Sequence, residues 1–185
     1  SLDNSHLARL MLRQFLSHPA SFLTVHKLHN DLSSQGIRVS KNTLYEYLDH
    51  MAESYIIFAV PKHSRSVRKQ AVNPRKIFTI DAALSRVFAA DPMLDRGRKL
   101  ENAVYLHFRR REEEVFYDAN GAEVDFVLGL NRPAWIVNVS FSLNDPATLR
   151  REVESLQWAK KKYPTAKPLL VAHELPARIR SSIIR

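Results

Sequence analysis

One carboxylate in this sequence stands in the middle of an apolar strand, where an unpaired charge is costly. Two alternating runs, residues 122–128 and 134–141, flank a turn rich in Gly, Asn and Pro, which predicts a β-hairpin. Asp125 lies at the centre of the first run. Because a carboxylate there needs a partner, we expect the hairpin to carry a paired acid or a metal site.

The alternation of the hairpin predicts which side chains lie beside Asp125, because successive side chains of a strand point to opposite faces. On the first strand we expect one face to hold Glu123, Asp125 and Val127, and the other Val124, Phe126 and Leu128. On the second strand we expect one face to hold Trp135, Val137, Val139 and Phe141, and the other Ile136, Asn138, Ser140 and Ser142. The hairpin then brings Asp125 opposite Asn138 and Ser140.

The elements around the hairpin follow from hydrophobic spacing and helix-ending residues. We expect a short helix over 81–88, a helix over 100–110, a strand over 114–117, a helix from Asp145-Pro146 to Pro164, and a strand over 168–173. Glu101 lies one position from the apolar stripe of the second of these helices. The last strand is a continuous apolar run, which is typical of a strand covered on both faces. After the short helix the order is helix, three strands, helix, strand.

The first 80 residues have a different pattern. Helices are predicted over 6–18, 25–33 and 41–55, with Thr24 and Ser40 as N-caps of the second and third. Strands are predicted over 55–60 and 77–80, and a basic loop over 61–76 joins them. Two short helices with a turn, followed by a basic hairpin, predict a winged helix-turn-helix.

A winged helix predicts where nucleic acid would be bound. The exposed start of the third helix would reach base edges, and the wing would contact phosphates. The predicted nucleic-acid-binding residues are Lys41, Asn42, Thr43, Lys62, Arg65, Arg68, Lys69, Arg75 and Lys76. The alternative is that this part packs against protein, since Glu46, Asp49 and Glu53 place acid on the third helix.

The second part, with an acid on its first helix and Asp in its second strand, has the layout of the restriction-endonuclease-like core. Nucleases of this type pattern as Asp, a short gap, then Glu-x-Lys on the adjacent strand, and their carboxylates hold Mg²⁺. The candidate catalytic residues are therefore Glu101, Asp125, Asn138 and Ser140, and the candidate metal ligands are Asp125, Glu101 and Glu123. Asn138 and Ser140 stand where Glu and Lys are expected, so two charges are missing.

Five stretches, in order along nearly the whole chain, carry a family resemblance: 39–48 (VSKNTLYEYL), 73–81 (NPRKIFTID), 97–105 (GRKLENAVY), 121–126 (GAEVDF) and 148–153 (TLRREV). The sequence resembles the C-terminal half of a large prokaryotic family of predicted ATPases. In that family a AAA-type ATP-binding domain precedes a winged helix and a nuclease-like domain of unknown function.

The resemblance implies an α/β (α+β) fold with two domains: a winged helix-turn-helix over 1–80 and an αβββαβ core, degenerate as a nuclease, over 81–185. Family members often keep Glu-Val-Lys where this chain has Asn138-Val139-Ser140. The phosphate-binding loop Gly-x-x-x-x-Gly-Lys-Ser/Thr is absent from the sequence, so ATP would bind only in an upstream domain.

Two functions from different classes fit these observations. The first is a non-catalytic module that binds DNA or a protein partner and is coupled to an upstream ATPase; Asp125 would then pair with an Arg or accept backbone hydrogen bonds. The second is a Mg²⁺-dependent nuclease with a displaced lysine, for which Lys160, Lys161 and Lys162 are candidates. A plain transcription regulator, acting through the first part alone, is a third.

Composition sets the outer limits. The formal charge of +9 invites a polyanionic partner, and an excess of six basic residues lies in residues 1–80. The absence of cysteine removes disulfides and thiolate sites and favours a cytoplasmic protein. No apolar run is long enough to cross a membrane. The missing initiator Met predicts that the sequence is part of a longer protein, and the sequence leaves the oligomeric state open.

Overall fold

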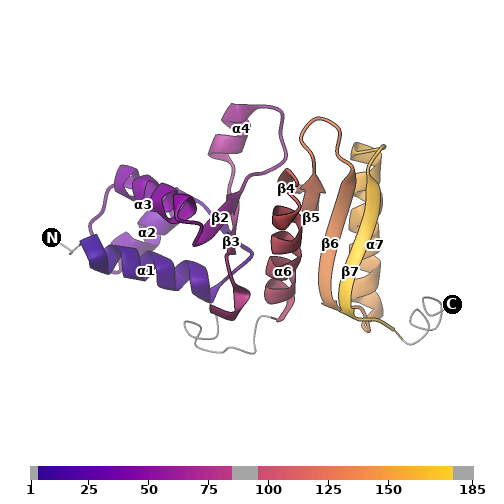
Figure 1. Cartoon of the computed structure of the whole chain (residues 1–185), viewed down its shortest axis with the longest axis horizontal. Coiled ribbons are helices and arrows are strands. Elements are labelled where there is room, and N and C mark those ends of the chain that lie inside the picture. The colour runs from indigo at the N-terminus through magenta and orange to yellow at the C-terminus, as the bar shows by residue number, and fades with distance from the viewer. Residues whose placement is uncertain (1–3, 85–95, 177–185) are drawn as a thin grey trace.

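The computed structural model describes residues 4–84 and 96–176. Within these residues the protein is mixed α/β, with a three-stranded and a four-stranded sheet (Figure 1). In the same residues, no helix combines the length and the apolar character that a membrane crossing requires.

The first part places three helices against a small sheet. Its elements are α1 (Asn4–Ser17), β1 (Ser21–Leu23), α2 (Val25–Ser34), α3 (Lys41–Glu53), β2 (Ile57–Val60), α4 (Val67–Val72), β3 (Arg75–Thr79) and a 3-10 turn over Ala82–Leu84. The sheet has the order β1-β3-β2 and is antiparallel throughout. Thr24 and Ser40 cap α2 and α3 by accepting hydrogen bonds from backbone N–H groups, as their residue types predict.

Two features of the first part differ from prediction. The segment between β2 and β3 is not all loop, because Ser66 caps the short helix α4. The short strand β1, which pairs with β3, is not visible in the hydrophobic pattern because it has only three residues. Of the helix predicted over 81–88, residues 85–88 lie outside the described residues.

The second part places one helix on each face of a four-stranded sheet. Its elements are α6 (Arg96–Arg110), β4 (Val115–Asn120), β5 (Ala122–Leu128), β6 (Trp135–Ser142), α7 (Pro146–Lys162) and β7 (Lys167–Glu174). The strand order is β4-β5-β6-β7; β4, β5 and β6 are antiparallel, and β7 runs parallel to β6. The predicted sequence of helix, three strands, helix and strand is found in these elements.

Strict alternation along β5 is wrong. Phe116 of β4 pairs with Val127, but Asp118, two residues on, pairs with Val124, so β5 carries one extra residue between these pairs. As a result Val124 packs with Val127 in the cluster beside α7, while Phe126 packs in the cluster beside α6. The bulge therefore lies at Asp125 and Phe126.

The strand β7 is also less covered than predicted. It is an edge strand with β6 as its one partner among the described strands, and the Leu169 side chain is 38% exposed. A continuous apolar run indicated burial on both faces, but the position of the strand in the sheet leaves much of it open.

The two sheets are joined through a shared core. Phe78 of β3 stacks on Tyr105 of α6 with ring centroids 4.3 Å apart, and both pack in one cluster with Phe126 of β5. Figure 1 shows α6 standing between β3 and the four-stranded sheet. The segment after β2 also pairs with β4, since the His63 N–H donates to the Tyr117 carbonyl at 2.7 Å. The contacts that position the candidate site therefore come from both halves of the chain.

Candidate functional site

One buried lysine meets three carboxylates between the two sheets. The Lys76 Nζ atom lies 2.9 Å from Asp125 Oδ1, 3.2 Å from Glu123 Oε1 and 2.7 Å from Glu101 Oε1. The Lys76 side chain is 2% exposed, and those of Glu101 and Asp125 are 11% and 14% exposed. We refer to these four residues as the Lys76 cluster.

Three elements, β3, α6 and β5, position the side chains of the Lys76 cluster. Lys76 and Phe78 are two residues apart on β3 and so share a face, and Phe78 is fixed by its stack on α6. Glu101 lies on the first half of α6, and Glu123 and Asp125 lie on β5 beside the bulge. Bulges commonly re-aim side chains next to functional sites.

The electrostatics of the cluster are uneven, because three carboxylates share one ammonium. Burial, together with the nearby charge of Asp125, raises the pKa of Glu101 to about 8. Burial opposes the charge on Lys76, but the three carboxylates outweigh it and raise the pKa of the lysine above its ordinary value. The short Glu101 contact is an ion pair without hydrogen-bond geometry, since Glu101 Oε1 has no hydrogen-bond partner in the described residues. Glu101 is therefore the member of the cluster whose pKa is raised toward the neutral range.

The second carboxylate oxygen of Asp125 and its backbone are held by β6. Asp125 Oδ2 accepts from the Val139 N–H at 2.8 Å, and the Asp125 N–H donates to Asn138 Oδ1 at 3.3 Å. The Asn138 Nδ2 donates to Glu152 Oε2 at 2.8 Å, while Arg151 donates to Glu152 Oε1 at 2.7 Å. Asn138 is buried and acts as a neutral connector between β5 and α7.

The remaining candidate catalytic residue does not join the cluster. The Ser140 hydroxyl donates to the Ser142 carbonyl at 3.1 Å. The predicted backbone hydrogen bond to Asp125 is present, but its charged partner is a lysine rather than an arginine. The structure therefore brings Glu101, Glu123 and Asp125 together, keeps Asn138 adjacent, and leaves Ser140 apart.

The central cation is the residue that sequence reasoning assigned to another role. Lys76 was predicted to contact phosphate, and this is wrong, because the side chain is buried. Of the lysines proposed as replacements, Lys160 donates to the Ala166 carbonyl, and Lys162 pairs with Asp118. The strand begins at Arg75, whereas the predicted strand began at Ile77. If the predicted strand had included residues 75 and 76, alternation would have placed Lys76 on the same face as Phe78.

The other predicted nucleic-acid-binding residues divide into two groups. Lys62 donates to Asn120 Oδ1 at 2.7 Å, and Arg65 donates to the Asn131 carbonyl at 3.0 Å, so both reach toward the second part. Arg65 is exposed despite this contact, and the other exposed members are Lys41, Asn42, Arg68, Lys69 and Arg75. Thr43 is half-buried, and its hydroxyl lies 2.9 Å from that of Ser40.

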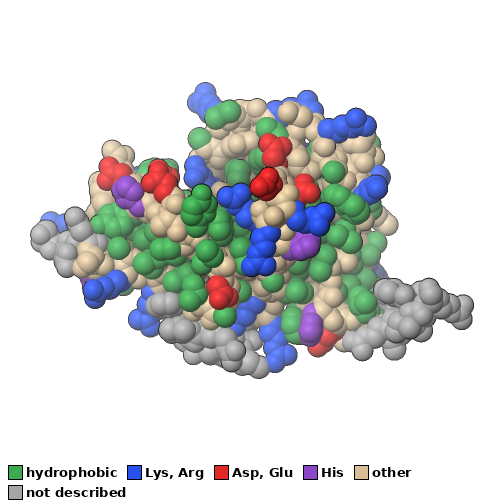
Figure 2. All heavy atoms as spheres, in the orientation of Figure 1, with side chains coloured by type: hydrophobic (Ala, Val, Ile, Leu, Met, Phe, Trp, Pro, Cys, Tyr) green, Lys and Arg blue, Asp and Glu red, His purple; other side chains and the backbone are tan. Residues whose placement is uncertain are grey.

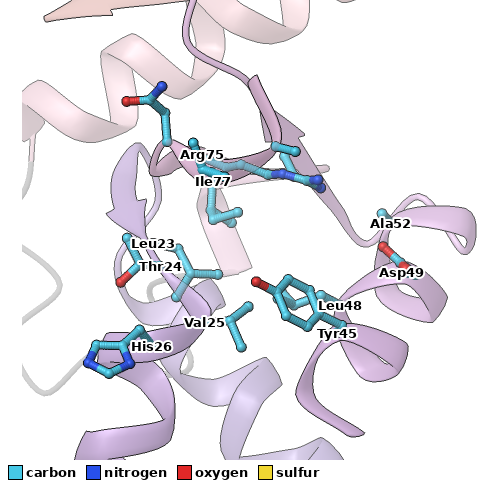
Figure 3. A pocket seen from close by; sticks show the side chains of 14 residues that line it. Leu23, Thr24, Val25, His26, Tyr45, Leu48, Asp49, Ala52, Arg75 and Ile77 are labelled. Carbon is cyan, nitrogen blue, oxygen red and sulfur yellow. The ribbon is translucent and has the colours of Figure 1, made fainter. Parts of the chain in front are cut away.

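A groove of about 310 Å³ lies beside the exposed group, between α3 and the first sheet. Figure 3 shows the Tyr45 ring and Arg75 at this groove, with Val25 on its floor. The Lys41 Nζ atom lies 3.0 Å from Nδ1 of His26, another lining residue. On the face drawn in Figure 2, Lys and Arg side chains lie along much of the outline rather than in one basic stripe.

A second ion cluster ties the segment after β2 to the second part. Tyr163 donates to Asp118 Oδ2 at 2.8 Å, Lys162 pairs with the same oxygen, and His63 Nδ1 lies 3.1 Å from the Tyr163 hydroxyl. Asp118 is fully buried. Burial lowers the pKa of His63, and burial with the Asp118 contact raises that of Tyr163. We refer to these four residues as the Asp118 cluster.

The arrangement does not fit a bound Mg²⁺ ion. A hard cation requires several oxygen ligands arranged around it, whereas the oxygens of all three candidate ligands surround Lys76 Nζ. Within residues 4–84 and 96–176, no group of three or more His, Asp or Glu side chains is arranged to hold a metal ion. The amide of Asn138 is engaged on both sides and adds no charge.

Comparison with known proteins finds relatives without an assigned function. An uncharacterized protein of Methanocaldococcus jannaschii is 28% identical over 148 residues, which cover 77% of this chain and 32% of that protein. An uncharacterized protein of Haemophilus influenzae is 20% identical over 163 residues, covering 88% of this chain and 40% of that protein. No family model and no solved structure matches significantly. The chain is thus similar to a part, well under half, of these longer proteins.

Proposed function

We propose that this chain is a non-catalytic DNA-binding module, built from a winged helix and a nuclease-like core, within a longer ATPase. The observation that best supports the absence of cleavage is the hydrogen bonding of the Asn138 side chain. It bonds the Asp125 backbone on one side and Glu152 on the other, so β6 offers Asp125 neither a second carboxylate nor a lysine.

The nuclease-like frame is supported by the order of elements from α6 to β7. In this order an acid from α6 and an acid from β5 converge, as the two carboxylates of such a core would. Ser140, which stands at the lysine position of the active pattern, bonds its own strand. A frame that keeps two acids and lacks the other two charges is expected to be inactive.

The DNA-binding part of the proposal is supported by α2, α3 and the exposed cations near them. Ser40 caps α3, so the exposed side chains of Lys41 and Asn42 stand at the start of a helix that follows a short turn. Arg75 lines the adjacent groove. The coupling to an ATPase is supported by the family resemblance, and the greater length of the relatives agrees with it.

The test for cleavage uses mixed DNA and RNA substrates with Mg²⁺ or Mn²⁺, with Asp125→Ala run in parallel. We expect no products from either protein. Products from the wild type that disappear in Asp125→Ala would overturn the proposal.

The test for DNA binding uses fluorescence anisotropy with a mixed-sequence duplex over a range of salt concentrations. Lys41→Glu with Arg75→Glu is expected to weaken binding about tenfold or more and to reduce the salt slope by roughly 2, as lost phosphate contacts do. The matched control is Arg132→Glu, an exposed residue of the β5–β6 turn. An equal loss of DNA affinity in the double variant and in Arg132→Glu would mean that DNA contacts a different surface. No binding even at low salt would favour a protein partner.

A displaced-lysine nuclease is the second candidate, because Lys76 supplies an ammonium 2.9 Å from Asp125. It would require Lys76 to turn aside from at least one acid before a cation could bind. This candidate predicts metal-dependent cleavage that both Lys76→Met and Asp125→Ala abolish, whereas the non-catalytic module predicts no cleavage to abolish.

A further inference from the structure

The three carboxylates of the Lys76 cluster share one central atom. Glu101 Oε1, Glu123 Oε1 and Asp125 Oδ1 lie between 2.7 and 3.2 Å from Lys76 Nζ. They come from two elements of the second part, α6 and β5, while the lysine comes from β3 of the first. Oxygens that converge in this way form a cation site, and here the cation belongs to the chain itself.

Lys76 has little freedom to leave this position. Its side chain is 2% exposed, and the Phe22 ring centroid lies 5.2 Å from Nζ on the side of β1. The strand β3 that carries it is the central strand of its sheet, paired with β1 and with β2. Neighbouring Ile77 and Phe78 are fully buried. Moving the ammonium out would require a change in the backbone or in the packing around it.

A divalent cation at the same oxygens would lie next to this ammonium. Mg²⁺ and Mn²⁺ bind carboxylate oxygens at roughly 2.0–2.2 Å, so the metal and Nζ would compete for the same small volume. Two positive ions this close, shielded from water, repel each other strongly. Two cavities border the cluster, one lined by Glu101 and Lys76 and the other by Asp125 and Asn138, and Glu123 lines both.

We propose that Lys76 is a built-in cation that fills the carboxylate site, excludes divalent metal, and fastens β3 to α6 and β5. This rests on the proposed function only in taking the acids as those of a nuclease-like frame. It extends that function by giving a physical reason for the absence of metal chemistry. Removal of the ammonium is expected to permit divalent-cation binding, because the three carboxylates, which are not spaced as a metal site while Lys76 lies between them, could then close around a metal ion.

The test is isothermal titration calorimetry with MnCl₂ on the full chain and on Lys76→Met. The wild type is expected to bind no Mn²⁺ below millimolar concentration, and Lys76→Met to bind it about tenfold or more tightly than the wild type. Lys62→Met, which removes a lysine of the same segment outside the cluster, is the matched control and is expected to behave as the wild type. Lys76→Met with Asp125→Asn is expected to lose the new binding.

Two results would overturn the inference: micromolar Mn²⁺ binding by the wild type, or a folded Lys76→Met that binds no better than the wild type. If Lys76→Met does not fold, Lys76→Met with Glu101→Gln lowers the excess negative charge and is subjected to the same titration and the same criteria. Micromolar Mn²⁺ binding by the wild type, without DNA cleavage, would reject this inference and leave the non-catalytic proposal standing. Cleavage would reject the non-catalytic proposal itself.

Discussion

The two buried ion clusters both join the first part of the chain to the second, but they differ in their balance of charge. The Lys76 cluster has three carboxylates around one ammonium, and the Asp118 cluster has one carboxylate with Lys162 and two neutral rings, Tyr163 and His63. In the Lys76 cluster, burial and then the charge of Asp125 raise the pKa of Glu101 to about 8.

The two clusters also differ in whether a cavity lies beside them. Two cavities of about 580 Å³ each border the Lys76 cluster, whereas Asp118 of β4 is buried against the end of α7. A balanced, enclosed cluster suits a purely structural role. An unbalanced cluster beside cavities is typical of a former or present functional site. Both clusters therefore join the two parts of the chain, and the Lys76 cluster is the candidate functional site.

The largest effect is expected from removing the shared ammonium. Lys76→Met leaves two mostly buried carboxylates and a half-exposed one without a cation, so the free energy of unfolding at pH 7 should fall by about 3–5 kcal/mol. Urea denaturation measures the loss. Lys62→Met, which breaks one exposed hydrogen bond, is the control and should lose at most about 1 kcal/mol. Similar small losses of unfolding free energy in both variants would mean that Lys76 does not hold β3 to α6 and β5.

A smaller effect is expected in the balanced cluster. Asp118→Asn keeps an acceptor for the Tyr163 hydroxyl but removes the charge that pairs with Lys162. Since the Lys162 side chain is 35% exposed and can be hydrated, the loss in unfolding free energy should be about 1–3 kcal/mol. A loss larger than that of Lys76→Met, measured by the same denaturation, would reverse the ranking of the clusters.

The pH dependence of stability should separate the clusters further. The folded-state pKa of Glu101 is raised from 4.5 to about 8, so folded Glu101 holds a proton that the unfolded chain releases in this interval. Its contribution is fully present below pH 4.5 and is lost as pH rises toward 8, with a slope of at most about 1.4 kcal/mol per pH unit. Urea denaturation across this range should show that Glu101→Gln removes the slope. An unchanged slope would mean that another group carries it.

The smallest effect is expected from His63. Burial lowers its pKa from 6.5, so the stability that neutral His63 contributes is lost as pH falls below 6.5 through the folded pKa. His63→Ala should cost about 1 kcal/mol at pH 7, where the hydrogen bond from Nε2 to the Leu130 carbonyl is lost, and less at pH 5. The difference between the two proteins, followed by thermal denaturation, should shrink toward acid pH. A difference that grows there would contradict the assignment.

Local features of the fold were well predicted because they depend on neighbouring residues. The caps Thr24 and Ser40 and the pair Asp145-Pro146 predicted the starts of three helices, and the bounds of the first hairpin strand, residues 122–128, were also predicted, although its strict alternation was not found. Each of these signals lies within a few positions of the element that it defines.

The candidate site was predicted only in part, because its centre depends on distant residues. The acids Glu101, Glu123 and Asp125 were identified from their types and places in the order of elements. Lys76 was not, since it lies 49 positions from Asp125 and alternation within β3 cannot show what faces it. The bulge at Asp125 was also missed, because it is a property of the pairing between β4 and β5.

The central claim, that the lysine ammonium takes the place of a metal, is tested most directly by crystals of the wild-type protein grown with Mn²⁺. Anomalous diffraction at the manganese edge would locate any bound ion. We expect no anomalous peak within coordination distance of Glu101, Glu123 or Asp125, with Lys76 Nζ in contact with all three. A peak bridging Asp125 and Glu101, with the Lys76 side chain turned away, would contradict the claim.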